Sequence, residues 1–367
     1  MKISKHHEST QDTPATQPTR PRGLWTLVVA CAVLGLPAAT AAPALATTYS
    51  ITDLGNLGFQ YTVANAINNN GQITGHSSTP QTIEGSCAPR HRPCPTHLFH
   101  AFLWEAGTMK DLGTLGGNYS DGTAINNLGE VAGTSEAKGE RISKNTFGSR
   151  CCEGFLSRNG MMTGIGEDLG LEFGVTGIND FGEIVGNASS GSFLVSGGHR
   201  TTLAGFAPVG INNHHLLAGD IGVAPEVEHA AIWNNGTITD LGTLGGLGSA
   251  AYAINDAGQV VGDSATSTGA GAAFIWQNGK MTDLGVDPIP SGINNNGLIV
   301  GNFGCGASTV ILTTGSVCQN LQSLIPANSG YTLSEARGIN DKGQIVAEAS
   351  LQSDPNHPRH SVLLTPN

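Results

Sequence analysis

The sequence contains few charged and few aromatic residues, and this scarcity excludes several kinds of structure. Asp, Glu, Lys and Arg make up 12% of the 367 residues, and Phe, Trp and Tyr make up 5%. No long segment places its apolar residues at helical spacing, so amphipathic helices are not expected. Glycine, by contrast, occurs 52 times. Many glycines with few Lys, Glu and Arg favour short strands joined by tight turns, and we predict an all-β protein.

Basic residues are scarce as well. The chain has 17 Lys and Arg against 28 Asp and Glu, which gives a net charge of −11. Residues 1–46 hold four of the basic and two of the acidic residues, which leaves −13 for the remainder. Proteins bind nucleic acids and anionic membranes through clustered Lys and Arg. We therefore expect neither as a partner.

The short motifs of common enzymes are missing too. The sequence has no G-x-S-x-G, H-E-x-x-H or P-loop motif, and its cysteines do not form the paired C-x-x-C of a metal site. We predict no catalytic residues, no metal ligands and no cofactor. One catalytic alternative stays open, because Asp and Glu dispersed around a channel would form a hydrolase or lyase site without any local motif.

Residues 1–46 are predicted to be an export signal and leader. Four basic residues precede an apolar stretch at 24–36, and two Ala-x-Ala sites end at Ala41 and Ala46. Thirteen apolar residues are too few to span a bilayer comfortably. Cleavage after either alanine remains open, and lipid attachment at Cys31 is an alternative. The signal predicts a secreted protein, extracellular or periplasmic, with no membrane span after processing.

The cysteines agree with export. An even number in an exported chain predicts disulfides, whose pairing the sequence leaves open. Six remain after the leader: Cys87, Cys94, Cys151, Cys152, Cys305 and Cys318.

A repeated Ile-Asn pair organises the rest of the chain. Each copy precedes a tight turn, and successive copies lie 58, 53, 33, 43, 39 and 46 residues apart. Periods near 40–50 residues are typical of propeller repeats. The seven Asn residues are Asn68, Asn126, Asn179, Asn212, Asn255, Asn294 and Asn340.

The unit at 249–284 shows the repeat most clearly. A small apolar first strand ends at Asn255, and a β-branched second strand follows the turn to Gly258. The third strand ends at Trp276, and the fourth carries Asp-Leu-Gly from Asp283. Four short antiparallel strands in about forty residues describe one propeller blade. The small first strand is expected innermost, with the tryptophans of the third strand (Trp104, Trp233 and Trp276) packing between blades.

The two chain ends complete one another. Residues 49–55 form a fourth strand with no blade before it, and residues 360–366 form a third strand with no fourth after it. Joined, they close the ring and protect the sheet edges. We predict one domain at 47–367, a seven-bladed β-propeller with four antiparallel strands per blade, with six or eight blades as alternatives. The expected blades are 60–113, 118–170, 171–204, 206–242, 247–285, 288–323, and 332–366 with 49–55.

The linked motifs HAFLW, DLGTLGG and AIN..G.VVG resemble the HAF-repeat family of exported bacterial proteins. His100-Ala101-Phe102 preserves the triplet, while the copies that begin at His229 and His360 are degenerate. The resemblance covers nearly everything after Tyr49, and units three and six depart most. It implies an extracellular or cell-envelope protein and carries no established catalytic residues.

The repeated polar residues are predicted to be structural. His100, His229 and His360 lie on third strands, away from the expected axis, where their rings would not converge on a ligand. The Asp of each Asp-Leu-Gly is expected to accept backbone N–H bonds. The Asn turns resemble calcium loops only in part, because their acidic positions vary. Calcium is therefore an alternative and not the expectation.

Two long insertions mark the expected binding face. Loops 76–97 and 134–152 both follow second strands in adjacent blades, and loops of that type share one face with the fourth-to-first connections. They hold most of the clustered basic residues: Arg90, His91, Arg92, Lys138, Arg141, Lys144 and Arg150. Long loops on a rigid scaffold commonly carry binding sites. We predict a non-catalytic scaffold that binds a protein or glycan there. The alternative is that these loops are solvent-exposed insertions that bind no partner.

Overall fold

The computed structural model describes residues 48–87, 92–138, 152–169, 174–285, 289–304, 306–313, 317–353 and 359–367. All of them belong to one compact unit, Ala42–Asn367. The predicted leader, including Cys31, Ala41 and Ala46, lies outside the described residues. Within the described part, no helix has the length and apolar character needed to cross a membrane.

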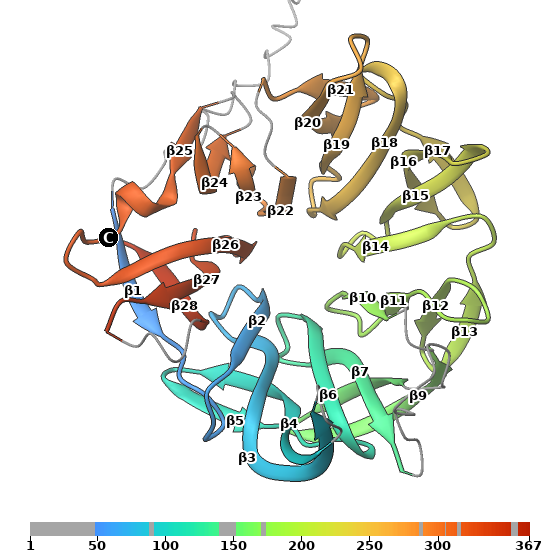
Figure 1. Ribbon diagram of the computed structural model, residues 1–367. Helices are drawn as coiled ribbons and strands as arrows, with labels where there is room; N and C mark the ends of the chain where they lie inside the picture. Colours follow the sequence, from blue (N-terminus) through green and yellow to red (C-terminus); the bar gives the residue numbers. More distant parts are fainter. Residues whose placement is uncertain are drawn as a thin grey trace, which may run out of the picture. The chain divides into compact units, whose positions relative to one another are not determined.

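The described residues form antiparallel sheets of consecutive strands, shown in Figure 1. The first group contains β2 (Thr62–Ile67), β3 (Ile73–Cys87), β4 (Arg92–Glu105) and β5 (Thr108–Asp111), and the second contains β6 (Gly116–Ile125), β7 (Val131–Ala137), β8 (Glu153–Arg158) and β9 (Met161–Asp168). The third contains β10 (Val175–Ile178), β11 (Ile184–Gly186), β12 (Phe193–Ser196) and β13 (His199–Thr202), and the fourth contains β14 (Ala207–Ile211), β15 (Leu217–Ala224), β16 (Val227–Asn234) and β17 (Thr237–Asp240). The fifth contains β18 (Gly245–Ile254), β19 (Val260–Thr266), β20 (Gly271–Gln277) and β21 (Lys280–Asp283), and the sixth contains β22 (Ile289–Ile293), β23 (Leu298–Gly304), β24 (Ala307–Thr313) and β25 (Cys318–Asn320), followed by the 3-10 helix η1 (Leu321–Leu324). The last contains β26 (Tyr331–Ile339), β27 (Ile345–Leu351), β28 (His360–Pro366) and β1 (Tyr49–Asp53).

Five of these groups are separate four-stranded sheets, and the first two are joined in one eight-stranded sheet. A single parallel residue pair, Phe99 with Tyr119, makes that junction. In Figure 1 the sheets are arranged radially, and first strands such as β14 and β26 point toward the centre. Four-stranded sheets set around an axis are the architecture of a β-propeller. The all-β class predicted from composition is confirmed.

The two ends of the described chain pair with each other. Strand β1 runs antiparallel to β28, from Tyr49 opposite Pro366 to Asp53 opposite Val362, as the sequence predicts. Tyr49 is 1% exposed and packs in one hydrophobic cluster with Leu333 and Leu364. Burial raises the pKa of the Tyr49 hydroxyl to about 12. This pairing covers the edge of β28, which would otherwise present unpaired backbone groups.

Hydrophobic clusters fill the space between neighbouring sheets. Trp104 lies in a cluster that joins Phe102 of β4 to Val346 and Leu363 of the last sheet. Trp276 packs against a cluster that joins the fourth and fifth sheets, and Trp233 packs against one that joins the third and fourth. Six of the seven second strands carry a glycine that lets two strands approach, since a Cβ on Gly262 would lie 1.9 Å from the Ala250 carbonyl oxygen; the second strand of the last sheet, β27, has Ala347 at this position.

Every first strand of the seven Ile-Asn repeats has a register shift at the same position, three residues before the Asn. A β-bulge leaves one residue outside the ladder and re-aims its side chain. At several units this side chain reaches the next sheet. Thr123 Oγ1 donates to the Val175 carbonyl oxygen at 2.8 Å, and Ser291 Oγ donates to that of Ala336 at 2.6 Å. The bulges therefore join neighbouring sheets through hydrogen bonds.

The prediction of a long loop at 76–97 was wrong. Strands β3 and β4 continue as a hairpin, paired from Thr82 opposite His97 to Cys87 opposite Arg92. The polar sequence with Pro80 resembled a loop because proline cannot donate to a ladder. Pro80 falls in the irregular stretch between Ser78 and Thr82, where a proline is tolerated.

Candidate functional site

The seven Ile-Asn turns meet in a closed ring of hydrogen bonds. Each Asn carboxamide nitrogen donates to the backbone oxygen of the next Asn, and Asn340 returns to Asn68 at 2.9 Å. The carboxamide oxygen is used within the turn: Asn68 Oδ1 accepts from the N–H groups of Asn70 and Gln72. All seven Asn side chains are buried. They hold the inner ends of the sheets together.

A second ring lies one residue further along each turn. The backbone N–H of each residue donates to the side-chain oxygen of its counterpart in the next turn, in seven bonds that also close. Its members are Asn69, Asn127, Asp180, Asn213, Asp256, Asn295 and Asp341. The two rings line a pocket of about 160 Å³.

This geometry bears on the calcium alternative. Calcium needs several free oxygen ligands, and the Asn oxygens already accept backbone N–H bonds. The Asp256 carboxylate oxygens accept from the N–H of Asn213 and from the carboxamides of Asn213 and Asn295. Among the described residues, no group of three or more His, Cys, Asp or Glu is arranged to hold a metal ion.

The Asp-Leu-Gly carboxylates form the predicted turns. Asp111 and Asp240 each accept from the glycine N–H two residues later, at 2.7 Å. The sequence reasoning missed their second partner: His100 Nδ1 contacts Asp111 at 2.9 Å, and His229 Nδ1 contacts Asp240 at 2.9 Å. The repeated His and Asp therefore join the third strand to the fourth.

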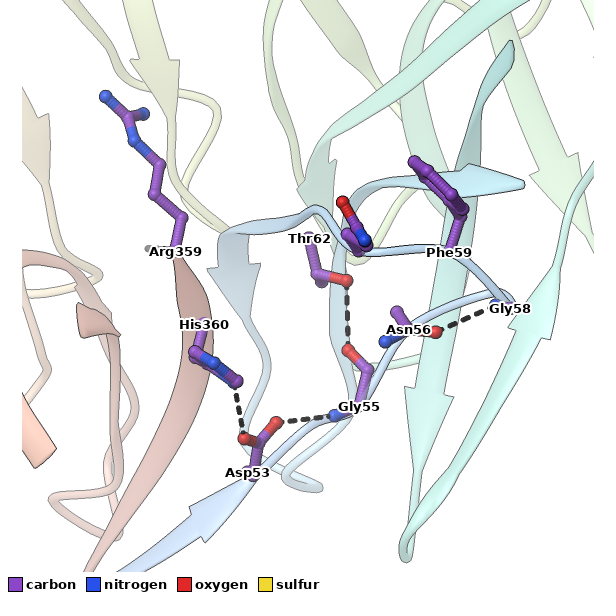
Figure 2. Close-up of a pocket in the computed structure, with 9 residues that line it drawn as sticks. Asp53, Gly55, Asn56, Gly58, Phe59, Thr62, Arg359 and His360 are labelled. Carbon is purple, nitrogen blue, oxygen red and sulfur yellow. Dashed lines mark hydrogen bonds and ion pairs between the residues drawn. The ribbon is translucent and has the colours of Figure 1, made fainter. Parts of the chain in front are cut away.

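The same His–Asp pair occurs where β1 pairs with β28, which we call the seam. Here His360 and Asp53 come from the two ends of the described chain, and they border the larger of the two pockets described. The Asp53 carboxylate accepts from His360 Nδ1 at 2.8 Å, from Tyr331 Oη at 2.8 Å and from the Gly55 N–H at 2.8 Å. The pocket has a volume of about 400 Å³ and is lined by seven residues of the segment 53–62 and by Arg359 and His360; the seven are Asp53, Gly55, Asn56, Gly58, Phe59, Gln60 and Thr62. Figure 2 shows Arg359 and Phe59 on opposite sides, with Thr62 and Gly55 between them.

The pocket exists because the seam departs from the repeat. In two other units, at 111–117 and 240–246, Asp-Leu-Gly is followed by Thr-Leu-Gly-Gly, and a Cβ on the second glycine of the later unit, Gly246, would lie 2.5 Å from Ala265 Cβ. Phe59 occupies this position at the seam. The neighbouring second strand is irregular there, and the Phe59 ring stacks on His97 with centroids 3.3 Å apart. His97 Nδ1 contacts the Thr79 carbonyl oxygen at 3.0 Å. The β3–β4 hairpin thus supports one wall.

Arg359 provides the opposite wall and the guanidinium of the pocket. Its Nη1 donates to Tyr61 Oη at 3.1 Å and lies 3.6 Å from Glu348 Oε2, while its guanidinium carbon lies 5.9 Å from the Tyr61 ring centre. Glu348 is 3% exposed and also pairs with Arg337. The Arg359 side chain remains 54% exposed, which suits a ligand contact.

A second polar cluster joins the fourth and fifth sheets. Asp220 Oδ1 accepts from the Ala251 N–H at 2.9 Å. Burial, with a smaller contribution from the nearby Glu228 and Asp263 carboxylates, raises the pKa of Asp220 to about 6, although the hydrogen bond from the Ala251 N–H acts to lower it. Burial and a hydrogen bond to Asp263 raise the pKa of Tyr252 as well. Perturbed carboxyls of this kind occur in active sites and in structural clusters alike.

The predicted basic residues are placed only in part. Arg92 begins β4, and Lys138 follows β7, where it is exposed. Arg90, His91, Arg141, Lys144 and Arg150 lie outside the described residues. Cys152 and Cys318 each take part in a disulfide. The side chains of Cys87, Cys94, Cys151 and Cys305 are outside the description, so which cysteines pair stays a prediction.

No protein-family model and no curated protein matches the sequence. Solved structures are similar at low identity. TolB from Acinetobacter baumannii is 9% identical with a TM-score of 0.40 over 81% of this chain and 64% of that one. The acylaminoacyl peptidase of Pyrococcus horikoshii is 9% identical with a TM-score of 0.47 over 80% and 49%. Trypanosoma rangeli sialidase is 10% identical with a TM-score of 0.37 over 84% and 54%. This chain therefore spans about half to two thirds of each of these three, and no TM-score reaches 0.5. No function is transferred from them.

Proposed function

We propose that the chain is an exported, seven-bladed propeller of the HAF-repeat kind that acts as a non-catalytic binding scaffold. The count of seven is supported by the two hydrogen-bond rings, each with seven members. It is also supported by the junction in the eight-stranded sheet, because one residue pair holds its halves together. Export and HAF-repeat membership rest on the leader at 1–46 and on the linked repeat motifs.

The observation that carries the binding function is the seam pocket with its hairpin wall. The pocket opens between a fourth-to-first connection and the beginning of a third strand, and Phe59 joins it to His97 of the hairpin. In the sequence, the basic residues at 90–92 follow Cys87, the last residue of β3. A rigid scaffold with a half-exposed arginine beside long connections is a typical binding arrangement. We assign a protein or a glycan as the partner of this face.

The test is a binding screen against a glycan array and against exported proteins. The full chain is compared with a variant that lacks residues 78–96 and with a control that lacks residues 223–226, the tip of the β15–β16 hairpin. Binding that is lost on the first deletion and kept on the second supports the proposal. Binding that survives removal of 78–96, with both variants folded by circular dichroism, contradicts it.

The alternative function is cleavage of a glycan, by hydrolysis or by a lyase reaction, with carboxylates near the axis as the catalytic groups. The observation that favours it is the Asp220–Asp263 cluster, because a carboxyl with a pKa of about 6 suits a general acid. Polysaccharides are screened for cleavage by the full chain, by D220N and by D263N. Turnover that both variants abolish would establish the enzyme. Cleavage unchanged in both would assign the cluster a structural role.

A further inference from the structure

The seam pocket carries a more specific inference, which rests on the proposed binding function. We propose that it binds one acidic sugar unit, whose carboxylate pairs with Arg359 and whose ring lies against Phe59. We further infer that a ligand bound in this pocket stabilises the pairing of β1 with β28.

The charged group is the Arg359 guanidinium. Its contacts among the described residues, with Tyr61 Oη and Glu348, both use Nη1. The Nε and Nη2 hydrogens are therefore available for a planar anion, and a guanidinium fork matches a carboxylate better than an ammonium does. Two carboxylates lie near this guanidinium: Glu348 contacts only Nη1 and also pairs with Arg337, and Asp53 already accepts three hydrogen bonds.

The shape of the pocket suits a sugar ring. Its volume of about 400 Å³ is at the small end of ligand sites, which favours a single ring over an extended peptide. Phe59 offers a flat apolar wall, and its stacking on His97 fixes its orientation before a ligand arrives. The carboxamides of Asn56 and Gln60 complete the lining with donors and acceptors that suit hydroxyl groups.

The walls come from both ends of the propeller chain. One set of lining residues runs from Asp53, the end of β1, to Thr62, while Arg359 precedes β28 and His360 begins it, and β1 pairs with β28. A ligand that contacts both segments binds only when they are paired. By linkage it must therefore stabilise the closed ring. Binding and seam protection are thus two readouts of one event.

The experiment uses the full chain and isothermal titration with D-galacturonate, with D-galactose as the neutral match. Galacturonate should bind and galactose should bind at least about tenfold more weakly, because a charge-assisted hydrogen bond is worth about that much. R359A should lose at least about tenfold in affinity, and R359K should fall between it and the natural protein. R200A is the matched control, since Arg200 also lies 5.9 Å from an aromatic ring, that of Phe193, in another sheet. Its affinity should be unchanged.

Hydrogen exchange gives the second readout. Saturating galacturonate should slow exchange of the β1 amides at 49–53 in the natural protein and leave R359A unaffected. Equal affinity for galacturonate and galactose, equal binding by R359A, or unchanged β1 exchange would overturn the inference. Tighter binding of a peptide with a free carboxyl terminus would overturn it in favour of a peptide ligand. An array ligand that requires 78–96 but tolerates R359A would refute this inference and leave the proposed function standing.

Discussion

Replacing Asn255 with alanine should strongly destabilise the protein, although the residue lies in a turn. The Asn255 carboxamide donates to the Asn294 carbonyl oxygen at 2.9 Å and to Gln259 Oε1 at 2.6 Å, and it accepts from the Gln259 N–H at 3.0 Å. The side chain is 4% exposed. In the variant the Gln259 N–H loses its hydrogen-bond partner, which costs about 1–3 kcal/mol, and the two acceptors each lose a bond worth about 0.5–1.5 kcal/mol. The expected loss in the free energy of unfolding is therefore roughly 2–6 kcal/mol.

Urea unfolding followed by circular dichroism measures this loss. The midpoint should fall while the denaturant slope stays constant, since the fold is unchanged. Asn234→Ala is the matched control, because Asn234 is exposed at the end of β16 and should change stability by less than about 0.5 kcal/mol. If both variants lose equally little, the Asn ring contributes no net stability and the reasoning fails.

Three further predictions concern single carboxyls and the seam. Burial raises the pKa of the Asp240 carboxyl, but hydrogen bonds from His229 and from the Gly242 N–H outweigh it and lower the pKa below 3.8. Asp240 therefore stabilises the fold above pH 3.8 and less as the pH falls through its folded pKa, so D240N should be less stable than the natural protein at pH 6, and this difference should shrink near pH 2. Equal gaps in urea midpoint at both values would contradict this. For Asp220 the sign reverses, because its folded pKa of about 6 exceeds the ordinary 3.8. Its contribution to the stability of the fold is present below pH 3.8 and is lost as the pH rises through 6. D220N should raise the melting temperature at pH 7.5 and change it little at pH 4; a lower melting temperature at pH 7.5 would refute the assignment. Finally, Tyr49→Ala should cost about 3–5 kcal/mol in urea unfolding, while the control Y49F stays within about 1 kcal/mol, and a small effect of Y49A would show that β1 does not hold the ring.

The fold was predictable because glycine turns and strand periodicity are local signals. The Ile-Asn spacing located every first strand, and the unmatched strands at the two ends predicted the pairing of β1 with β28. Units three and six form sheets although they lack the His and Asp-Leu-Gly pair, because apolar residues such as Phe193 and Val310 still fill the core between sheets. Local polar motifs were therefore less necessary for the fold than the alternation of apolar residues.

The candidate site was not predictable from local patterns because it combines residues about 300 positions apart. Arg359 contacts Tyr61 only after the ring closes, and no spacing rule relates the two. One signal was present: Phe59 replaces a glycine that other units need for close packing. The β-bulges of the first strands could not be predicted from the sequence either, because a bulge depends on which strand lies opposite and not on the composition of its own strand.

The second polar ring shows how charge limits the sequence of a closed repeat. Asp occurs at 180, 256 and 341, and between these positions lies an Asn that donates to both neighbours, as Asn213 does to Asp180 and Asp256. Two adjacent carboxylates would repel at this distance, and an amide between them supplies the donors that both require. Strict alternation cannot close on seven members. Two amides must therefore meet, and Asn69 beside Asn127 is that point, where the Asn69 N–H donates to Asn127 Oδ1 at 2.9 Å. The three Asp residues are thus placed so that no two carboxylates are adjacent in a ring with an odd number of members.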